Sequence, residues 1–362
     1  MENLEINSNF WSGRSVFLTG HTGFKGGWMA LWLSEMGAKV HGYSLDPCTE
    51  PNFYNETNLR EKLTSSTIAD IQNIETLKSS LINANPSIVI HMAAQSLVHH
   101  SYINPLETYK TNVIGTLNLF EVLKKIDSVK VLLNVTSDKC YQNNEQLKPY
   151  SENDRLGGYD PYSNSKACSE LISVAYRNSF FREIGLRIAT VRAGNVIGGG
   201  DWSMNRLIPD FFRATDSGEK LFVRSPNAVR PWQHVLEPIL GYLLLAEKLY
   251  NLGENYEGAW NFGPLEYNFK NVSWIINYLC QKFLNVEWSI DKKTQPHEAN
   301  LLFLDSSKAR LKLNWNTRWP IELCLDKIIE WHQALKEKKN MSEISISQIK
   351  SYEDYLINKI TD

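Results

Sequence analysis

Three glycines, Gly20, Gly23 and Gly26, limit the possible folds of this chain more than any other feature. They follow a short apolar stretch, Arg14 to Thr19, and precede apolar residues at helical spacing from Trp28 to Met36. Strand, glycine turn and helix therefore follow in order. In such a turn the first glycine bends the chain, the second lets backbone N–H groups approach a pyrophosphate, and the third packs helix on strand. The spacing predicts an anion at a helix N-terminus.

The next predicted strand, Lys39 to Ser44, bears on which cofactor would bind there. It ends near Asp46, 20 residues after Gly26, where a carboxylate would hydrogen-bond an adenosine ribose. A free 2′-hydroxyl suits that carboxylate, so the pattern favours NAD over NADP. The alternative is a plain loop, because glycine turns also occur without a ligand. Besides the glycines, the turn offers four cofactor-binding candidates: His21, Thr22, Phe24 and Lys25.

Strands and helices alternate through the first half of the chain, which predicts an α/β fold with a Rossmann-type doubly wound parallel sheet. The further strands expected are Ser87 to Met92, Val129 to Val135 and Leu186 to Arg192, and the helices are Pro105 to Lys125 and Pro161 to Phe180.

From about Gly194 the pattern breaks into segments rich in Gly, Pro and Trp, which suit a lid over a ligand. An apolar helix, Glu237 to Tyr250, and a short strand, Ala259 to Phe262, then return to the sheet. We therefore expect a smaller mixed α/β substrate-binding domain beside the sheet. The division is 10–194 with about 233–263 for the domain that binds the dinucleotide, about 195–232 and 264–340 for the substrate-binding domain, and 341–362 as a C-terminal tail.

Composition excludes several classes of protein. The net charge of -2 gives no basic surplus for nucleic acid, and no run approaches the roughly 18 to 20 apolar residues of a membrane span. The N-terminal residues lack an apolar signal region, so we expect a cytoplasmic protein. Five scattered cysteines without a CxxC pair predict neither disulfides nor a zinc site, and we expect no metal.

Tyr162 and Lys166 stand four residues apart on a predicted helix, so both side chains project from one face. A nearby ammonium favours a phenolate and would make Tyr162 a usable base. A preceding strand ends in Val135-Thr136-Ser137-Asp138-Lys139, at the carboxyl edge where ligands of open α/β sheets bind. Ser137 is the candidate to hydrogen-bond the oxygen that Tyr162 deprotonates. The alternative for the Tyr–Lys pair is two surface residues on an amphipathic helix.

Together these residues resemble the extended branch of the short-chain dehydrogenase/reductase superfamily. The resemblance implies that Ser137, Tyr162 and Lys166 form its catalytic set, with Lys166 also able to hold a ribose. HMAAQS, which contains Ala93, resembles the cofactor segment at a strand end, and Asp70 in IADIQN resembles the acid that contacts adenine. A helix N-cap is the alternative for Asp70.

The resemblance narrows to the nucleotide-sugar 4,6-dehydratases. That family carries Asp and Glu directly after the Ser or Thr, whereas this chain has Asp138 and Lys139, and Asp then Lys is typical of the members that act on CDP-glucose. TGHTGFKGGW, SLDP, RAGNVIGGGDW and RPWQHVLEP are also similar, and the likeness runs from about Phe10 to Leu335. His21 and Lys25 depart from the wider superfamily, where small or apolar residues are usual.

The same resemblance assigns Asn195 and Arg230 to the substrate diphosphate, and an amide and a guanidinium suit phosphate oxygens. A surface ion pair with Glu237 is the alternative for Arg230. Trp202 and Arg206 are candidate pocket walls, although a tryptophan beside glycines also serves as packing.

The resemblance implies an NAD-dependent dehydratase of CDP-glucose. Tyr162 would take the proton of the sugar 4-hydroxyl, Asp138 would protonate the departing 6-hydroxyl, and Lys139 stands where relatives place the base for C5. A homodimer or dimer of dimers through the helices at 105–125 and 161–180 is also implied. Three alternatives stay open: a 4,6-dehydratase of another nucleotide sugar, a 4-epimerase, and a non-catalytic NAD-binding regulator.

Overall fold

The computed structural model describes residues 6–265, 268–283, 286–291 and 301–360, and a seven-stranded sheet forms its centre. All neighbouring strands of this sheet are parallel, in the order β11-β6-β5-β4-β1-β2-β3. The strands are β1 (Ser15–Thr19), β2 (Lys39–Ser44), β3 (Ser65–Ile68), β4 (Ile88–His91), β5 (Val131–Val135), β6 (Arg187–Ala193) and β11 (Gly258–Phe262). The predicted doubly wound sheet is thus confirmed, with β3 as an additional edge strand.

Alternate residues along each strand face opposite layers of helices. On β1, Leu18 belongs to one buried cluster and Phe17 to the other, and Ile90 and Val89 of β4 divide in the same way. Helices α2 (Phe24–Glu35) and α11 (Leu236–Leu252) pack with the first cluster, and α5 (Ile74–Ala84) and α8 (Gly115–Leu123) pack with the second. Because both faces are covered, the strands are apolar almost without interruption, as the sequence shows.

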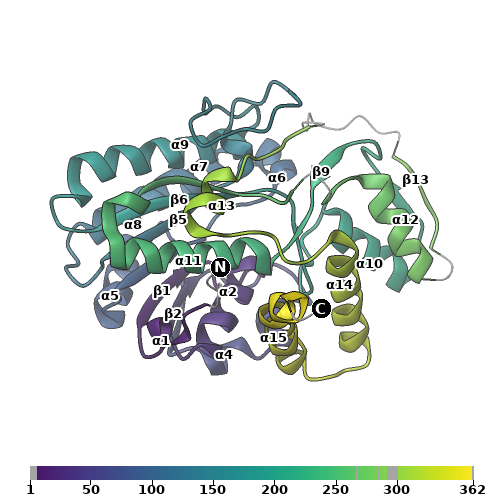
Figure 1. Ribbon diagram of the computed structural model, residues 1–362, viewed down its shortest axis with the longest axis horizontal. Coiled ribbons are helices and arrows are strands. Elements are labelled where there is room, and N and C mark those ends of the chain that lie inside the picture. The colour runs from purple at the N-terminus through teal and green to yellow at the C-terminus, as the bar shows by residue number, and fades with distance from the viewer. Residues whose placement is uncertain (1–5, 266–267, 284–285, 292–300, 361–362) are drawn as a thin grey trace.

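Much of the chain beyond β6 builds a second region from short strand pairs and helices, while α11 and β11 return to the sheet. Figure 1 shows α10, α12 and α14 at one end of the molecule, and α5, α8 and α9 (Pro161–Tyr176) at the other. The strand pairs are β7 (Val196–Ile197) with β10 (Gln233–His234), β9 (Val229–Pro231) with β12 (Phe269–Asn271), and β8 (Leu221–Val223) with β13 (Trp288–Ile290). The helices of this region are α10 (Leu207–Ser217), α12 (Val272–Lys282) and α14 (Ile321–Lys336), whereas α13 (Ser307–Leu313) packs beside β11 and α11.

The remaining helical segments are short and mostly connect the larger elements. They are α1 (Ser8–Trp11), α3 (Phe53–Glu56), α4 (Leu59–Lys62), α6 (Val98–Ile103) and α7 (Pro105–Tyr109), π-helical Lys110–Ile114 and Arg177–Phe181, and 3₁₀ turns Asp138–Cys140 and Gly253–Tyr256.

The expected C-terminal tail contains helix α15 (Met341–Ile360). Met341, Ile349 and Tyr352 are buried in the same cluster as α2, and the indole of Trp32 donates to Glu353. The helix therefore closes one side of the fold, and this part of the chain is structural.

No helix within the described residues is long and apolar enough to cross a membrane. All five cysteines lie in those residues, and each of them is free.

Candidate active site

The glycine turn has the shape that a dinucleotide requires. Gly20 has a φ of +80°, and a Cβ there would lie 2.8 Å from the backbone N of Ala93. A Cβ at Gly26 would lie 2.0 Å from the carbonyl oxygen of Gly20, so strand and helix meet too closely for any side chain. Gly23 is exposed and is the N-cap of α2 without a side-chain cap, which leaves the first N–H groups of the helix open to an anion.

His21 and Thr22 are buried structural members of this turn. The His21 ring lies against Gly42, where a Cβ would come within 2.5 Å, and its Nε2 is 2.7 Å from the Ser66 hydroxyl. Burial lowers the pKa of His21 to about 4, so its imidazole is neutral at physiological pH. The Thr22 hydroxyl donates to the carbonyl of Leu45 at 2.8 Å, which ties the turn to the segment after β2.

Lys25 extends from the turn into the interior, toward the catalytic residues. Its Nζ lies 3.5 Å from the hydroxyl of Tyr242 on α11. Burial and, to a smaller extent, the nearby Arg206 charge lower the pKa of Lys25 to about 7, although Asp138 opposes the decrease. Sequence reasoning placed Lys25 with the cofactor and missed Tyr242, which carries no motif.

The other cofactor candidates lie at the carboxyl edge of the sheet. The backbone N–H of Ala93, just after β4, donates to the Thr19 hydroxyl at 3.0 Å. Asp46 is exposed after β2. Asp70 follows β3 and accepts from the backbone of Gln72 at 2.9 Å, whereas the N-cap of α5 is Asn73, so the structure does not support the N-cap alternative for Asp70.

The segment after β5 brings Ser137, Asp138 and Lys139 together in a tight turn. The Ser137 hydroxyl accepts from the Lys139 backbone at 3.2 Å and donates to Asp138 Oδ1 at 3.0 Å. Lys139 Nζ lies 3.9 Å from the same oxygen. Asp138 Oδ2 is buried without a hydrogen-bond partner among the described residues, which leaves it available to a bound hydroxyl.

Tyr162 and Lys166 lie on the first turns of α9, and both are buried beside this segment. Burial raises the pKa of Tyr162, although a hydrogen bond with Ser137 and the Lys139 and Arg206 charges offset part of that effect. The sequence predicts that the Lys166 ammonium lowers the pKa of Tyr162, whereas in the structure this pKa is raised. Lys166 Nζ donates to the Val135 carbonyl at 3.1 Å, and burial lowers its pKa to about 8.

The predicted substrate-side residues follow β6. The Asn195 Oδ1 atom is buried without a partner in the described parts of the chain. Arg206 donates to Asp201 at 3.0 Å and, across to the segment after β4, to the Ser96 hydroxyl at 3.2 Å. Arg230 is buried on β9, and the Glu237 carboxylate accepts from the backbone of Arg318 and Trp319 and from Tyr352, so the structure does not support a surface ion pair between the two.

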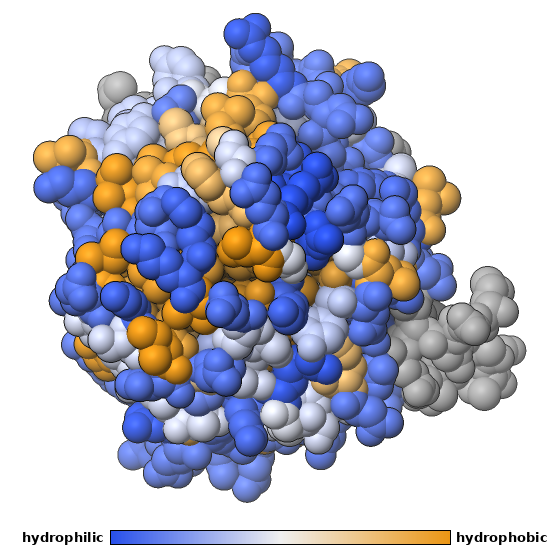
Figure 2. All heavy atoms as spheres, turned by 90° about the vertical axis from the view of Figure 1, so that its left-hand side faces the viewer, coloured by the Kyte–Doolittle hydropathy of each residue, from blue (hydrophilic) through white to orange (hydrophobic). Residues whose placement is uncertain are grey.

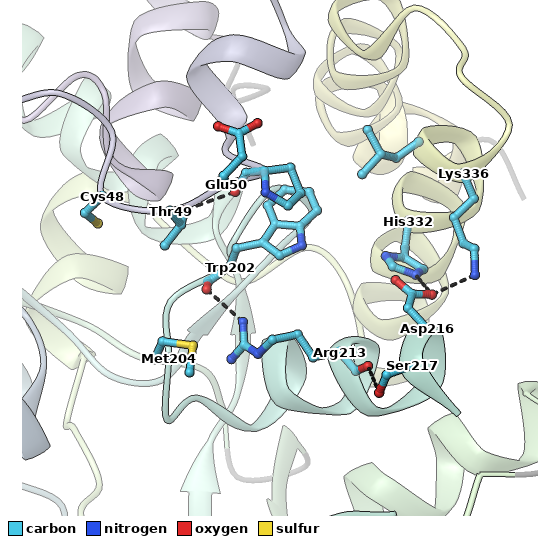
Figure 3. A pocket seen from close by; sticks show the side chains of 12 residues that line it. Cys48, Thr49, Glu50, Trp202, Met204, Arg213, Asp216, Ser217, His332 and Lys336 are labelled. Atoms are coloured by element: carbon cyan, nitrogen blue, oxygen red, sulfur yellow. Dashed lines mark hydrogen bonds and ion pairs between the residues drawn. The ribbon is translucent and has the colours of Figure 1, made fainter. Parts of the chain in front are cut away.

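Trp202 lines a cavity of about 560 Å³ whose lining contains none of the predicted catalytic residues. Figure 3 shows its indole between the loop of Glu50 and the α14 side chains His332 and Lys336. Arg213 donates to the Trp202 carbonyl at 2.8 Å. Trp202 therefore lines a cavity that the predicted catalytic residues do not share.

Sequence reasoning missed the buried pair Glu170 and Arg192, whose side chains are 2.7 Å apart. Glu170 follows Lys166 by four residues, so the helical spacing held a signal that was not used.

The parallel sheet, the glycine turn and the Ser–Tyr–Lys set at its carboxyl edge define the class of short-chain dehydrogenases/reductases. Two solved structures share the fold: dTDP-glucose 4,6-dehydratase from Bacillus anthracis in complex with NAD, and UDP-glucose 4-epimerase with UDP-glucose from Thermotoga maritima. The first has a TM-score of 0.73 and 21% identity, covering 91% of this chain and 100% of that one. The second has a TM-score of 0.75 and 24% identity, covering 89% and 99%.

The sequence comparisons identify the family. The sequence model of the family described as GDP-mannose 4,6 dehydratase matches residues 17–328, and the chain belongs to this family. The CDP-glucose 4,6-dehydratase of Salmonella typhimurium is 47% identical over 353 residues, which cover 96% of this chain and 98% of that protein. An Arabidopsis thaliana protein that includes a UDP-glucose 4,6-dehydratase is 26% identical over 73% of this chain and 38% of its own length.

Proposed function

We propose that this protein is a CDP-glucose 4,6-dehydratase that converts CDP-glucose to CDP-4-keto-6-deoxyglucose. The single observation that carries the proposal is the turn after β5, where Asp138 and Lys139 follow Ser137 directly and face the Tyr162 side of α9. An acid beside the Ser–Tyr–Lys set allows elimination of water as well as oxidation at C4. The 47% identity to the Salmonella typhimurium enzyme supports CDP-glucose as the substrate.

NAD is the proposed cofactor. Gly20, Gly23 and Gly26 would hold its pyrophosphate, with Asp46 at the adenosine ribose and Lys166 at the second ribose. Ala93 and Asp70 would line the same edge. When bound, NAD supplies the oxidation of C4 and the later reduction of C6, so no net reductant is needed.

The protein's own residues would move the protons. Tyr162 takes the proton of the 4-hydroxyl while Ser137 hydrogen-bonds the same oxygen. Asp138, when protonated on its unpartnered Oδ2, gives that proton to the departing 6-hydroxyl, which leaves as water. Burial of all three side chains excludes water from these transfers.

Two roles are open to Lys139, which stands where relatives place a carboxylate. It either removes the C5 proton, or it stabilises the enolate charge that forms when another group does so. Asn195, Arg206 and Arg230 are proposed for the substrate diphosphate, because amide and guanidinium groups suit phosphate oxygens.

The proposal is tested by incubating the protein and NAD with a panel of nucleotide-glucose donors, without reductant. We expect CDP-glucose to lose one water by mass, and deuterium at C4 to appear at C6 of the same molecule. If only a different nucleotide-glucose donor loses water, the nucleobase proposed for the substrate is wrong and the dehydratase reaction stands. Epimerisation at C4, or binding without turnover, would replace the dehydratase proposal.

We also propose a homodimer, or a dimer of such dimers, through α7, α8 and α9. Figure 2 shows hydrophobic side chains gathered on the face at this end of the molecule. Exposed apolar residues on these helices and the adjoining turns include Leu106, Ile114, Leu171, Val174 and Phe180. Such a patch is typical of an interface. Light scattering of the parent and of Leu171→Glu checks it, with the variant expected to be monomeric.

We also propose a cytoplasmic location. All five cysteines are free in the described structure, which fits a reducing compartment. Cell fractionation checks this location.

A further inference from the structure

We propose that Glu170 is a positioning residue for the catalytic set, and that its carboxylate fixes α9 against the ends of β5 and β6 and supplies the negative charge that the Lys166 ammonium faces. This inference rests on the proposed function for the roles of Tyr162 and Lys166. It adds a residue that touches neither substrate nor cofactor.

Glu170 lies on the same face of α9 as the catalytic pair. It follows Lys166 by four residues and Tyr162 by eight, which is close to one and two helical turns. Its side chain is 1% exposed. A carboxylate so deeply buried requires partners for both oxygens.

Both carboxylate oxygens of Glu170 are bonded to neighbouring strands. Oε1 accepts from the Thr136 hydroxyl at 2.5 Å and from Arg192 Nε at 2.8 Å. Oε2 accepts from the Thr190 hydroxyl at 2.6 Å and from Arg192 Nη2 at 2.7 Å. Thr136 directly precedes Ser137, so the carboxylate joins the catalytic helix to the catalytic turn.

Arg192 continues the connection to the far side of that turn. Its Nη1 donates to the Tyr141 hydroxyl at 2.7 Å, and Tyr141 donates to Asn261 Oδ1 at 2.7 Å. Tyr141 follows the 3₁₀ turn Asp138–Cys140. The network thus holds both ends of the segment that carries Asp138 and Lys139.

Glu170 also faces Lys166 electrostatically. Burial lowers the pKa of Lys166, and Glu170 opposes that decrease, as does Cys140 to a smaller extent. Other titratable groups that interact with Lys166 among the described residues include Lys25, whose pKa is lowered to about 7, and His91, whose pKa burial lowers to about 3. Although burial opposes its ionisation, Arg192 and the two threonine hydroxyls keep the pKa of Glu170 below its ordinary value. Glu170 is therefore the charged carboxylate nearest to Lys166 in the sequence, and it lies on the same face of α9.

The test measures the titration of Lys166 directly, by pH-dependent acetylation with acetic anhydride and mass spectrometry of the peptide that contains it. The variants are Glu170→Gln, Glu170→Asp and the double variant Glu170→Gln/Arg192→Met. Glu121→Gln is the matched control, because Glu121 also accepts from α9, through the Tyr176 hydroxyl at 2.6 Å, near the other end of the helix.

We expect Glu170→Gln to increase the acid dissociation constant of Lys166 about tenfold or more, because it removes the anion and leaves Arg192. The double variant should show a smaller increase, since it removes both charges, and Glu170→Asp should stay near the parent value. Glu121→Gln should not change it. In the activity assay, Glu170→Asp should lower kcat with little change in KM, because the shorter side chain releases Thr136.

An unchanged titration in Glu170→Gln, or an equal change in Glu121→Gln, would overturn the proposal. If Glu170→Gln does not fold, the double variant decides, because it leaves no unpaired buried charge. The acetylation needs no substrate. A parent protein that fails to convert CDP-glucose would therefore count against the proposed function. The titration of Lys166 would still test the role of Glu170.

Discussion

Two buried glutamates in this fold have pKa values shifted in opposite directions. Glu170 and Glu237 are 1% and 0% exposed, and each accepts several hydrogen bonds. For Glu170, two of those bonds come from the guanidinium of Arg192, which keeps the pKa below its ordinary value against the effect of burial. For Glu237, burial dominates and raises the pKa from 4.5 to about 7.

The partners of Glu237 explain this difference. They are the backbone N–H groups of Arg318 and Trp319, at 2.8 to 3.0 Å, and the Tyr352 hydroxyl at 2.5 Å. The guanidinium of Arg318 donates instead to the carbonyls of Tyr352 and Glu353. A bidentate cation therefore keeps a buried carboxylate charged where neutral donors do not.

The two regions also differ in what they hold together. The Glu170 region joins the elements that carry the proposed catalytic residues. The Glu237 region joins α11 to the segment before α14 and to α15, far from those residues in the chain. Substitutions in the first region should change turnover, and substitutions in the second should change the free energy of unfolding. The following predictions test that separation.

The largest effect is expected for Tyr162→Phe, which removes the ionisable oxygen and keeps the ring. Turnover of CDP-glucose should decrease by roughly 10²-fold or more, the range for loss of a positioned general base. Steady-state kinetics and urea unfolding measure the two quantities, and the free energy of unfolding should stay near that of the parent. A turnover near the parent value would remove Tyr162 from the mechanism.

The next prediction concerns Lys139→Arg. Lys139 Nζ lies 3.9 Å from Asp138, and arginine keeps a positive charge at this position but cannot act as a base near neutral pH. If Lys139 removes the C5 proton, the variant should still oxidise C4, seen as NADH absorbance, and should almost lose exchange of the C5 hydrogen with deuterated water. Substantial C5 exchange in the folded variant would assign Lys139 the charge-stabilising role.

The sequence predicted one of these regions far better than the other. The strands and the glycine turn follow from local spacing, and Tyr162 and Lys166 share a helix, so their juxtaposition needs no tertiary information. Glu170 shares that helix too, but its partner Arg192 comes from a strand 22 residues away. Only the folded sheet shows that they meet.

The Glu237 region has no comparable local signal. Its partners Trp319 and Tyr352 lie 82 and 115 residues further along the chain. Strand β3 was missed because three of the four residues in SSTI are polar and it lies at the sheet edge, and α15 because it is polar along most of its length. Such elements form because of the residues that they pack against, and these residues are distant in the sequence.

The third prediction is a pH dependence of stability that depends on Glu237. Its pKa is higher in the folded protein than the ordinary 4.5, so the folded state binds more protons between pH 4.5 and about 7. The free energy of unfolding should therefore decrease as pH rises through this window, by at most about 1.4 kcal/mol per pH unit from this group. Urea unfolding at several pH values should show a smaller decrease in Glu237→Gln. An equal decrease in the variant would place the linkage elsewhere.

The smallest effect is expected for Tyr352→Phe, which removes one of the donors to Glu237 and keeps the ring against Trp319, 5.1 Å between centroids. The carboxylate keeps its backbone partners, so the loss should be about 1 to 2 kcal/mol of unfolding free energy at neutral pH. Because that hydroxyl lowers the pKa of Glu237, its removal should extend the pH-dependent decrease to higher pH. Tyr256→Phe is the control, since its exposed hydroxyl makes only a 3.5 Å bond to Lys312. Turnover of CDP-glucose at 25 °C should match the parent in both variants. A kcat lowered in Tyr352→Phe by as much as in Glu170→Asp would show that the two regions are coupled, and the separation of catalysis from stability would then be wrong.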